Sequence, residues 1–258
     1  MTPARFWRDM PSSAFGDHTK DWIAVLPVAA IEQHGPHLPV GVDAIVAEGL
    51  VARVAAALPP DLPVTFLPVE EVCKSNEHIA FPGTLTVDWD VVIRTWVQIG
   101  ESVARAGVRT LVIVTSHGGN VPPMEIAARE LRQRLGMRAV TTAWGRLGSA
   151  APKPQGLVID IHAGQAETSW MLALRPDLVD MAKARDFRSA QEQVVDASGR
   201  LGYHMMAANM AWLSQDLNPA GAVGNAAAAT AEAGEADIAA MVEGFVALMR
   251  DLARLPPP

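Results

Sequence analysis

The sequence predicts an α/β fold in layers, built on a largely parallel sheet. Short apolar runs rich in Val, Ile and Leu alternate along the chain with longer segments whose apolar residues recur at helical spacing. Half of the 258 residues are hydrophobic, so a sizeable core is available, and the length is close to the upper limit for one compact core. We therefore expect one domain that spans residues 1–258.

The strands of the expected sheet are short apolar runs without the alternation of a half-exposed strand. In order they are residues 22–30, 63–68, 108–115 and 138–143. The runs at 22–30 and 108–115 have the composition of buried strands. Because sites in such sheets collect at the carboxyl ends of the strands, the residues that follow these two runs are candidate site residues.

The expected helices are bounded by recognisable start and stop residues. They cover residues 43–57, 88–106, 122–135, 164–174 and 238–252, with a weakly patterned helical segment over 186–212. Asp88 is expected to cap the second helix and Gly107 to end it. The third has two prolines in its first turn and Gly136 after its end. Residues 70–87 and 145–160 have the composition of loops.

Composition excludes several classes of protein. The net charge is −7, which disfavours nucleic acid as a partner, because phosphate binding needs clustered Lys and Arg. No apolar run approaches the ~18 residues of a membrane-spanning helix, and residues 1–20 lack the pattern of a signal peptide. Cys73 is the only cysteine, so no internal disulfide can form. We expect a cytoplasmic protein with no membrane partner.

The stretch that follows the first strand carries the strongest functional signal. It reads Ile-Glu32-Gln-His34-Gly-Pro-His-Leu-Pro and continues to Asp43. Glu32 and His34 are two residues apart, so in extended chain they face the same side. Divalent metals bind this mixture of carboxylate oxygen and imidazole nitrogen. The alternative is a polar loop with solvated acids, and this stretch alone does not decide between them.

A second candidate segment, Ser-His117-Gly118-Gly119-Asn, lies between the third strand and the third helix. Two glycines after a histidine allow the backbone to pass close to a metal or a substrate. One alternative is the oxyanion loop of a serine hydrolase, but the chain has no G-x-S-x-G nucleophile motif. The other is a tight turn whose histidine is hydrogen-bonded in the core.

The third segment is Asp-Ile161-His162-Ala-Gly-Gln-Ala-Glu167, at the start of a helix. Such a histidine and glutamate can supply a metal ligand and an acid/base group. Capping of the helix by a first-turn carboxylate is the alternative. Taken together, the three segments favour a shared metal site. Dinuclear hydrolases hold two ions ~3.5–4 Å apart, and Asp43 is the natural bridging carboxylate. The donor types suit Zn²⁺, Mn²⁺ or Fe²⁺.

These motifs resemble the creatininase (creatinine amidohydrolase) family along nearly the whole chain and in the right order. The matching segments are the stretch from Glu32 to Asp43, Ser-Asn-Glu77-His78-Ile-Ala-Phe-Pro-Gly-Thr, the His117 segment, the His162 segment, and Gly-Ala-Val-Gly near residue 224. The resemblance implies a three-layer α/β/α fold, two divalent metal ions per chain, hydrolysis of an amide and a homo-oligomer, often a hexamer. Zn²⁺ is the expected metal.

The resemblance also implies roles for individual residues. Glu32, His34, Asp43 and His117 match metal ligands, with Asp43 as the bridge, and His162 matches the catalytic histidine. Creatininases place a further ligand glutamate at the position of Gly119, so we infer that Glu167 supplies that carboxylate here. Ile161 replaces an acidic residue of creatininases. The Gly-Gly-Asn sequence occurs in the wider family, with its formamide hydrolases and peptide-processing members, so the expected substrates extend beyond creatinine itself.

The leading functional hypothesis is hydrolysis of a small cyclic amide, creatinine-like or a lactam, by a metal-activated water. The backbone N–H groups of Gly118 and Gly119 are expected to stabilise the oxyanion, and His162 to protonate the leaving nitrogen. Glu77, His78 and Trp144 are expected to line the pocket; the alternatives are a solvated loop for the first two and a core position for Trp144. Cleavage of a formamide or a peptide is a second hypothesis, and a non-catalytic scaffold or ligand-binding protein is a third.

Overall fold

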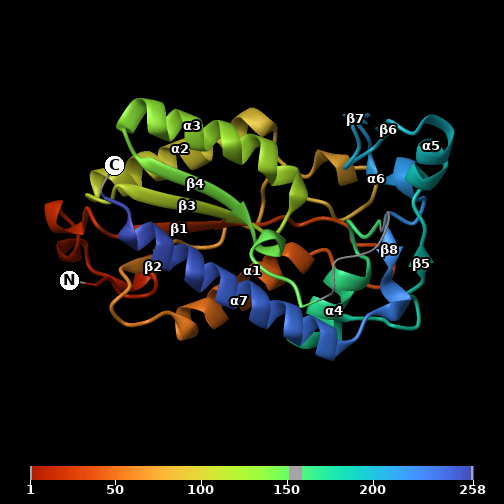
Figure 1. Cartoon of the computed structure of the whole chain (residues 1–258), viewed down its shortest axis with the longest axis horizontal. Helices are drawn as coiled ribbons and strands as arrows, with labels where there is room; N and C mark the ends of the chain where they lie inside the picture. Colours follow the sequence, from red (N-terminus) through yellow and green to blue (C-terminus); the bar gives the residue numbers. More distant parts are fainter. Residues whose placement is uncertain (1, 151–158, 257) are drawn as a thin grey trace.

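The computed structural model describes residues 2–150, 159–256 and 258, and it has the predicted layered α/β architecture (Figure 1). At its centre is a four-stranded sheet in the order β2-β1-β3-β4, and every neighbouring pair is parallel. The strands are β1 (Ile23–Val28), β2 (Val64–Phe66), β3 (Thr110–Thr115) and β4 (Arg138–Ala143). All four strand predictions are confirmed, with ends that differ by at most two residues.

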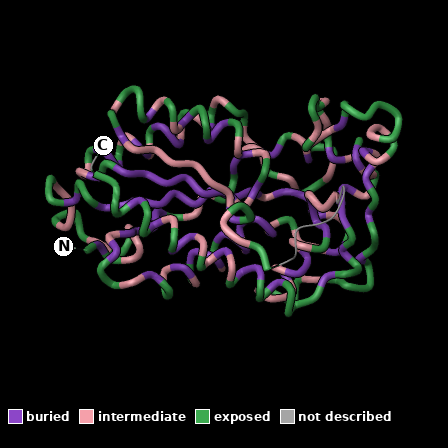
Figure 2. The backbone as a smooth tube through the Cα atoms, viewed as in Figure 1, coloured by how far each residue is buried: buried purple, intermediate pink, exposed green. Residues whose placement is uncertain are grey.

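Helices cover both faces of the sheet. The pair α2 (Trp89–Arg105) and α3 (Val121–Leu135) packs on one face, while α1 (Val42–Ala57) and α7 (Ala231–Arg254) cover the other together with α4 (Gln165–Leu174) (Figure 1). The strands supply alternate side chains to the two layers: Leu111 and Ile113 join the core under α2 and α3, whereas Val112 and Val114 join the core under α1 and α7. This confirms a three-layer α/β/α arrangement, with the buried strands at its centre (Figure 2).

Two helix predictions need correction. Only α5 (Gln191–Ser198) is helical within residues 186–212; the rest forms β5 (Asp186–Phe187), β6 (Leu201–Gly202), β7 (Ala208–Asn209) and turns. The segment lacks a continuous apolar stripe, and Gly199 ends α5 in a left-handed conformation with φ 66°. The last helix, in contrast, begins at Ala231 rather than 238, because Thr230 caps it and its alanines favour helix.

Smaller differences concern caps and loops. Asp88 precedes α2, but its side chain makes no capping hydrogen bond; its carbonyl oxygen accepts from Val91 and Val92 instead. The expected loop over 70–87 contains one 3₁₀ turn, Asn76–His78, and isolated β-bridges at Glu70 and Leu85. Of the expected irregular segment 145–160, residues 151–158 lie outside the described part of the chain. No helix among the described residues combines the length and apolar character needed to cross a membrane.

A smaller region completes the molecule at the carboxyl end of the sheet. It holds α5, α6 (Ser214–Leu217), the β6–β7 pair and the antiparallel pair formed by β5 and β8 (Gly224–Asn225) (Figure 1). An antiparallel bridge between His162 and Val223 ties this region to the segment that enters α4. Polar segments from distant parts of the sequence therefore converge beyond the ends of β1 and β3.

Candidate metal centre

Four segments bring ionisable side chains together at the carboxyl edge of the sheet. The segment after β1 supplies Glu32 and His34, and the segment after β3 supplies His117. Asp43 lies in the first turn of α1, and Glu167 in the first turn of α4. The geometry therefore joins the three motifs that the sequence singled out, because parallel strands end at one edge and the two helices begin there.

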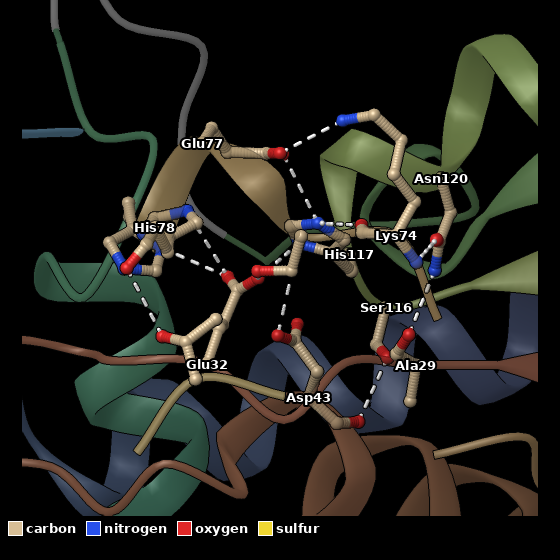
Figure 3. A network of polar contacts seen from close by, with 12 residues as sticks. Ala29, Glu32, Asp43, Lys74, Glu77, His78, Ser116, His117 and Asn120 are labelled. Atoms are coloured by element: carbon tan, nitrogen blue, oxygen red, sulfur yellow. Dashed lines mark hydrogen bonds and ion pairs between the residues drawn. The ribbon is translucent and has the colours of Figure 1, made fainter. Parts of the chain in front are cut away.

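One group of potential metal ligands consists of Glu32, Asp43 and His117, all of them buried (Figure 3). His117 Nδ1 lies 3.2 Å from Glu32 Oε2 and 3.9 Å from Asp43 Oδ2. One donor atom from each residue lies within 4.8 Å of the others. This spacing allows a single ion to bind all three, since metal–oxygen and metal–nitrogen bonds are about 2.0–2.2 Å for zinc.

A second group combines Asp43 with His34 and Glu167. His34 Nε2 lies 3.7 Å from Asp43 Oδ2 and 3.6 Å from Glu167 Oε2. The Asp43 carboxylate thus belongs to both groups, as a bridging ligand would. A third group, Glu32 with His34 and His162, meets the same distance criterion and competes for two of these side chains.

Unsatisfied polar atoms mark the centre as a place for a cation. Glu32 Oε1, His34 Nε2 and Asp43 Oδ2 are buried and have no hydrogen-bond partner among the described residues. A buried polar atom without a partner costs roughly 1–3 kcal/mol, and more when it is charged. All three atoms belong to the proposed ligand groups, and they are donor atoms that divalent metals bind. The residues present therefore fit a metal pair.

The electrostatics lead to the same conclusion. Burial, and after it the charge of Glu32, raises the pKa of Asp43 well above its ordinary value, and burial raises the pKa of Glu167 to about 8. Burial opposes ionisation of Glu32 too, but His117, His78 and His162 together outweigh it and hold the pKa of Glu32 well below its usual range. Three carboxyl groups thus share one buried space, and divalent cations would compensate their charge.

Outer hydrogen bonds fix which ring nitrogen each histidine presents. His34 Nδ1 lies 3.0 Å from the carbonyl oxygen of Glu32, and His117 Nε2 lies 3.0 Å from that of Lys74. A carbonyl oxygen only accepts, so these nitrogens carry a proton, and His34 Nε2 and His117 Nδ1 are the atoms that face the centre. Against the effect of burial, Glu32 raises the pKa of His117 well above its ordinary value, so a metal that binds Nδ1 would displace the proton held there. Ser75 Oγ donates to Glu32 Oε2 at 2.6 Å and orients that carboxylate.

Glu77 occupies the space beside Gly119. Its Oε1 lies 3.3 Å from His117 Nε2, and its Oε2 accepts from Lys74 Nζ at 2.9 Å. A Cβ atom at residue 119 would overlap Glu77 Oε1 and lie 3.1 Å from Glu77 Cδ. Glu77 therefore takes up the space that a side chain at residue 119 would need, while Glu167 belongs to the second ligand group.

His78 and His162 stand side by side next to Glu32, both buried. Their ring centroids are 4.2 Å apart, and His162 Nδ1 lies 3.6 Å from Glu32 Oε1. Burial, together with the nearby His34, lowers the pKa of His162 well below its ordinary value, so its ring is neutral near pH 7. Gly118 opens the 3₁₀ turn Gly118–Asn120 beside His117, with no described atom within 4 Å of the place of its missing Cβ.

Trp144 does not reach the centre. Its indole is 1% exposed and packs against Phe245 of α7, with ring centroids 4.9 Å apart, in the core beneath α1 and α7. The expectation that Trp144 lines the pocket is therefore wrong. The residue directly follows β4, and its side chain joins the core that includes α1 and α7 residues.

Sequence reasoning missed three residues that hold the centre in place. Ser75 and Lys74 bind Glu32 and Glu77, and Gln33 contacts both His78 and His162. Gln33 and Ser75 stood within the quoted motifs, but nothing in a linear pattern distinguishes a polar loop residue from one that is buried among ligands.

This fold and centre define a class: α/β proteins that carry a buried histidine–carboxylate site at the carboxyl edge of a parallel sheet. The model of one such family, Creatininase (creatinine amidohydrolase), matches residues 8–249. The chain therefore belongs to the creatininase family. The sequence resemblance is confirmed, and with it the fold.

Individual relatives differ in their described activities. The chain is 34% identical over 230 residues to the mycofactocin precursor peptide peptidase of Mycobacterium tuberculosis, covering 86% of this chain and 82% of that protein. It is 35% identical over 184 residues to the creatinine amidohydrolase of Pseudomonas putida, covering 64% and 69%. A solved creatininase structure aligns with a TM-score of 0.77 at 26% identity, over 99% of this chain and all of that one.

Proposed function

We propose that this protein is a dinuclear metal-dependent amidohydrolase. The observation that carries the proposal is the buried Asp43 carboxylate, which two groups of potential ligands share. Glu32 and His117 would complete one site, and His34 and Glu167 the other. Both groups contain imidazole and carboxylate donors, which suit Zn²⁺ first and Mn²⁺ or Fe²⁺ as well. When bound, a pair of such ions supplies an acidified water as nucleophile and polarises the amide carbonyl.

His162 is the proposed catalytic residue. Its Nε2 lies 2.7 Å from the carbonyl oxygen of Gln33, so Nε2 carries the proton and Nδ1 faces the centre with a lone pair. A neutral imidazole in this position can accept a proton from the nucleophile and return it to the leaving nitrogen. The backbone N–H groups of Gly118 and Gly119 and the side chains of Glu77 and His78 are the proposed contacts to the substrate.

A hollow of about 300 Å³ lies beside the centre and supports a small substrate or the end of a longer one. Gln33 and His34 form its polar side, and its apolar side is lined by Leu38, Val40, Phe81 and Pro82. We propose a cyclic amide, creatinine-like or a lactam, as the first substrate class. The second is a peptide, because the relative that matches 86% of this chain is described as a peptidase.

Metal content per chain tests the centre directly. We expect two ions per chain in the wild type, about one in Glu167→Ala and none in Asp43→Ala, because Asp43 belongs to both groups. Elemental analysis after dialysis against Zn²⁺ measures this. One ion or none in the wild type would refute the dinuclear centre and favour a mononuclear or non-catalytic role.

Turnover separates the role of His162 from that of a ligand. We expect His162→Ala to keep two ions and to lose activity by a factor of about 10²–10⁴, the usual contribution of a general acid–base. Loss of an ion from this variant would instead make His162 a ligand in the third group. A panel of creatinine, lactams, formamides and short peptides, with release of the new amine as readout, distinguishes the substrate classes.

A further inference from the structure

Gln33 lies between the two neighbouring histidines of the centre. It is buried, and its side chain reaches His78, His162 and the loop at Gly221. No role was expected for it from the sequence, since a glutamine is neither a metal ligand of the usual kind nor an acid or base. Its hydrogen bonds, however, determine where the protons of the adjacent imidazoles lie.

The orientation of the Gln33 amide follows from its backbone partners. The N–H of Gly35 can only donate, and it lies 2.9 Å from Gln33 Oε1. The carbonyl oxygen of Gly221 can only accept, and it lies 2.8 Å from Gln33 Nε2. Exchanging the oxygen and nitrogen of the amide would place donor against donor and acceptor against acceptor. The –NH₂ group therefore faces Gly221 and the histidines.

The two amide hydrogens are then fully assigned. The shortest contacts of Gln33 Nε2 are Gly221 O and His78 Nδ1, each at 2.8 Å; His162 Nε2 and Ser214 Oγ lie farther away, at 3.2 and 3.5 Å. His162 Nε2 carries its own proton toward the Gln33 carbonyl oxygen, so it cannot accept. His78 Nδ1 is thus the acceptor, and the proton of this neutral imidazole resides on Nε2.

Gly221 makes this arrangement sterically feasible. Its φ is 76°, and a Cβ atom there would overlap Gln33 Oε1 and lie 2.7 Å from Gln33 Cδ. The absence of a side chain lets the loop approach the amide closely enough for its carbonyl oxygen to bind.

We propose that Gln33 is a positioning residue that holds His78 with its proton on Nε2, so that His78 presents a hydrogen-bond donor to the centre. His78 Nε2 lies 3.5 Å from Glu32 Oε1, close to where His162 Nδ1 presents a lone pair. The two adjacent imidazoles thereby take opposite roles, one donating and one accepting. A nitrogen that carries a proton cannot bind a metal, so Gln33 also excludes His78 from the ligand set.

The catalytic role of this arrangement rests on the proposed function, in which His78 Nε2–H would donate to the substrate carbonyl oxygen. The proton positions can nevertheless be measured without turnover. Long-range ¹H–¹⁵N correlation spectra of protein with ¹⁵N-labelled histidine distinguish the two neutral forms of each ring. They can be recorded on metal-free and on Zn²⁺-loaded protein, and His78→Asn identifies the His78 signals.

In the wild type we expect His78 and His162 both to carry the proton on Nε2. In Gln33→Leu, His78 Nδ1 loses its donor, so its proton should distribute over both nitrogens, whereas His162 keeps its bond to the backbone carbonyl of residue 33. Gln191→Leu is the matched control. Gln191 is also buried and bonds backbone groups of Tyr203 and His204, away from the centre. It should leave the His78 signals unchanged.

Metal content should remain at the wild-type value in Gln33→Leu, while turnover falls by about 10–100-fold, as for other outer residues that orient a site. A proton on His78 Nδ1 in the wild type would overturn the inference, and this result does not depend on the folding of any variant. An unchanged His78 form in Gln33→Leu would overturn it too. If the wild type binds no metal but shows the expected proton positions, the proposed function fails and the assignment of Gln33 stands.

Discussion

Close packing between α4 and α7 predicts that replacing one helical glycine by alanine lowers the stability of the protein, although the same replacement usually raises it. Glycine inside a helix usually destabilises it by about 0.5–1 kcal/mol relative to alanine. Gly234 lies near the start of α7, where that helix crosses α4. A Cβ atom at residue 234 would overlap the carbonyl oxygen of Ser169 and lie 2.9 Å from the backbone nitrogen of Trp170. We therefore expect Gly234→Ala to destabilise the protein.

The magnitude follows from what must move. The opposing atoms are backbone atoms of a helix, which cannot rotate away as the end of a side chain can. Overpacking of a core costs about 1–3 kcal/mol, and a contact with backbone belongs at the upper end of that range. Subtracting the gain in helix propensity leaves about 2 kcal/mol. For a chain of this size, that corresponds to a fall in Tm of about 4–8 °C.

Differential scanning calorimetry of the Zn²⁺-loaded protein measures the change. Gly145→Ala is the control, because the nearest atom to a Cβ there is Trp170 Cη2 at 4.0 Å. We expect its effect to stay within about 0.5 kcal/mol. A displaced α4 would also move Glu167, so the second metal ion should bind more weakly in Gly234→Ala. An unchanged or higher Tm in Gly234→Ala would refute the packing argument.

Two further predictions use buried titratable groups that are not among the proposed metal ligands. Burial raises the pKa of Cys73 to about 12 from 9.0, so the fraction of thiolate falls by a factor of about 10³. Because the thiolate is the reactive form, labelling by Ellman's reagent at pH 8 should be fast only after unfolding. Rapid labelling of the native protein would contradict this. Burial also lowers the pKa of His37 to about 4, against 6.5 in the unfolded chain, while its ring stacks on Phe187. The unfolded state therefore binds the extra proton between these values, so stability is lost as the pH falls from 6.5 toward 4. From pH 7 to pH 5 the free energy of unfolding, measured in urea, should fall by about 2 kcal/mol less in His37→Gln than in the wild type. An equal fall in both proteins would show that His37 is not the group responsible.

The sequence alone predicted the sheet and most of the helices, because their signals are local. Continuous apolar runs identify strands that are covered on both faces, and glycines or prolines mark the ends of α2 and α3. Residues 186–212 were predicted incorrectly, since a weak apolar pattern does not specify whether a segment finds a surface on which to pack. The start of α7 was set by the Thr230 cap and a run of alanines, which an argument from apolar periodicity overlooks.

For the candidate site too, some features could be predicted from the sequence and others required the tertiary structure. Glu32, His34, Asp43, His117 and Glu167 could be named from the sequence, because metal ligands belong to few residue types and these follow strand ends or begin helices. Only the tertiary structure decided that Asp43 is common to two ligand groups, that Glu77 fills the space beside Gly119, and that Trp144 belongs to the core. The Gln33 contacts to His78 and Gly221 join residues 45 and 188 positions apart. Residue type and local periodicity are written in the sequence, whereas hydrogen-bond direction and steric exclusion arise only when distant segments meet.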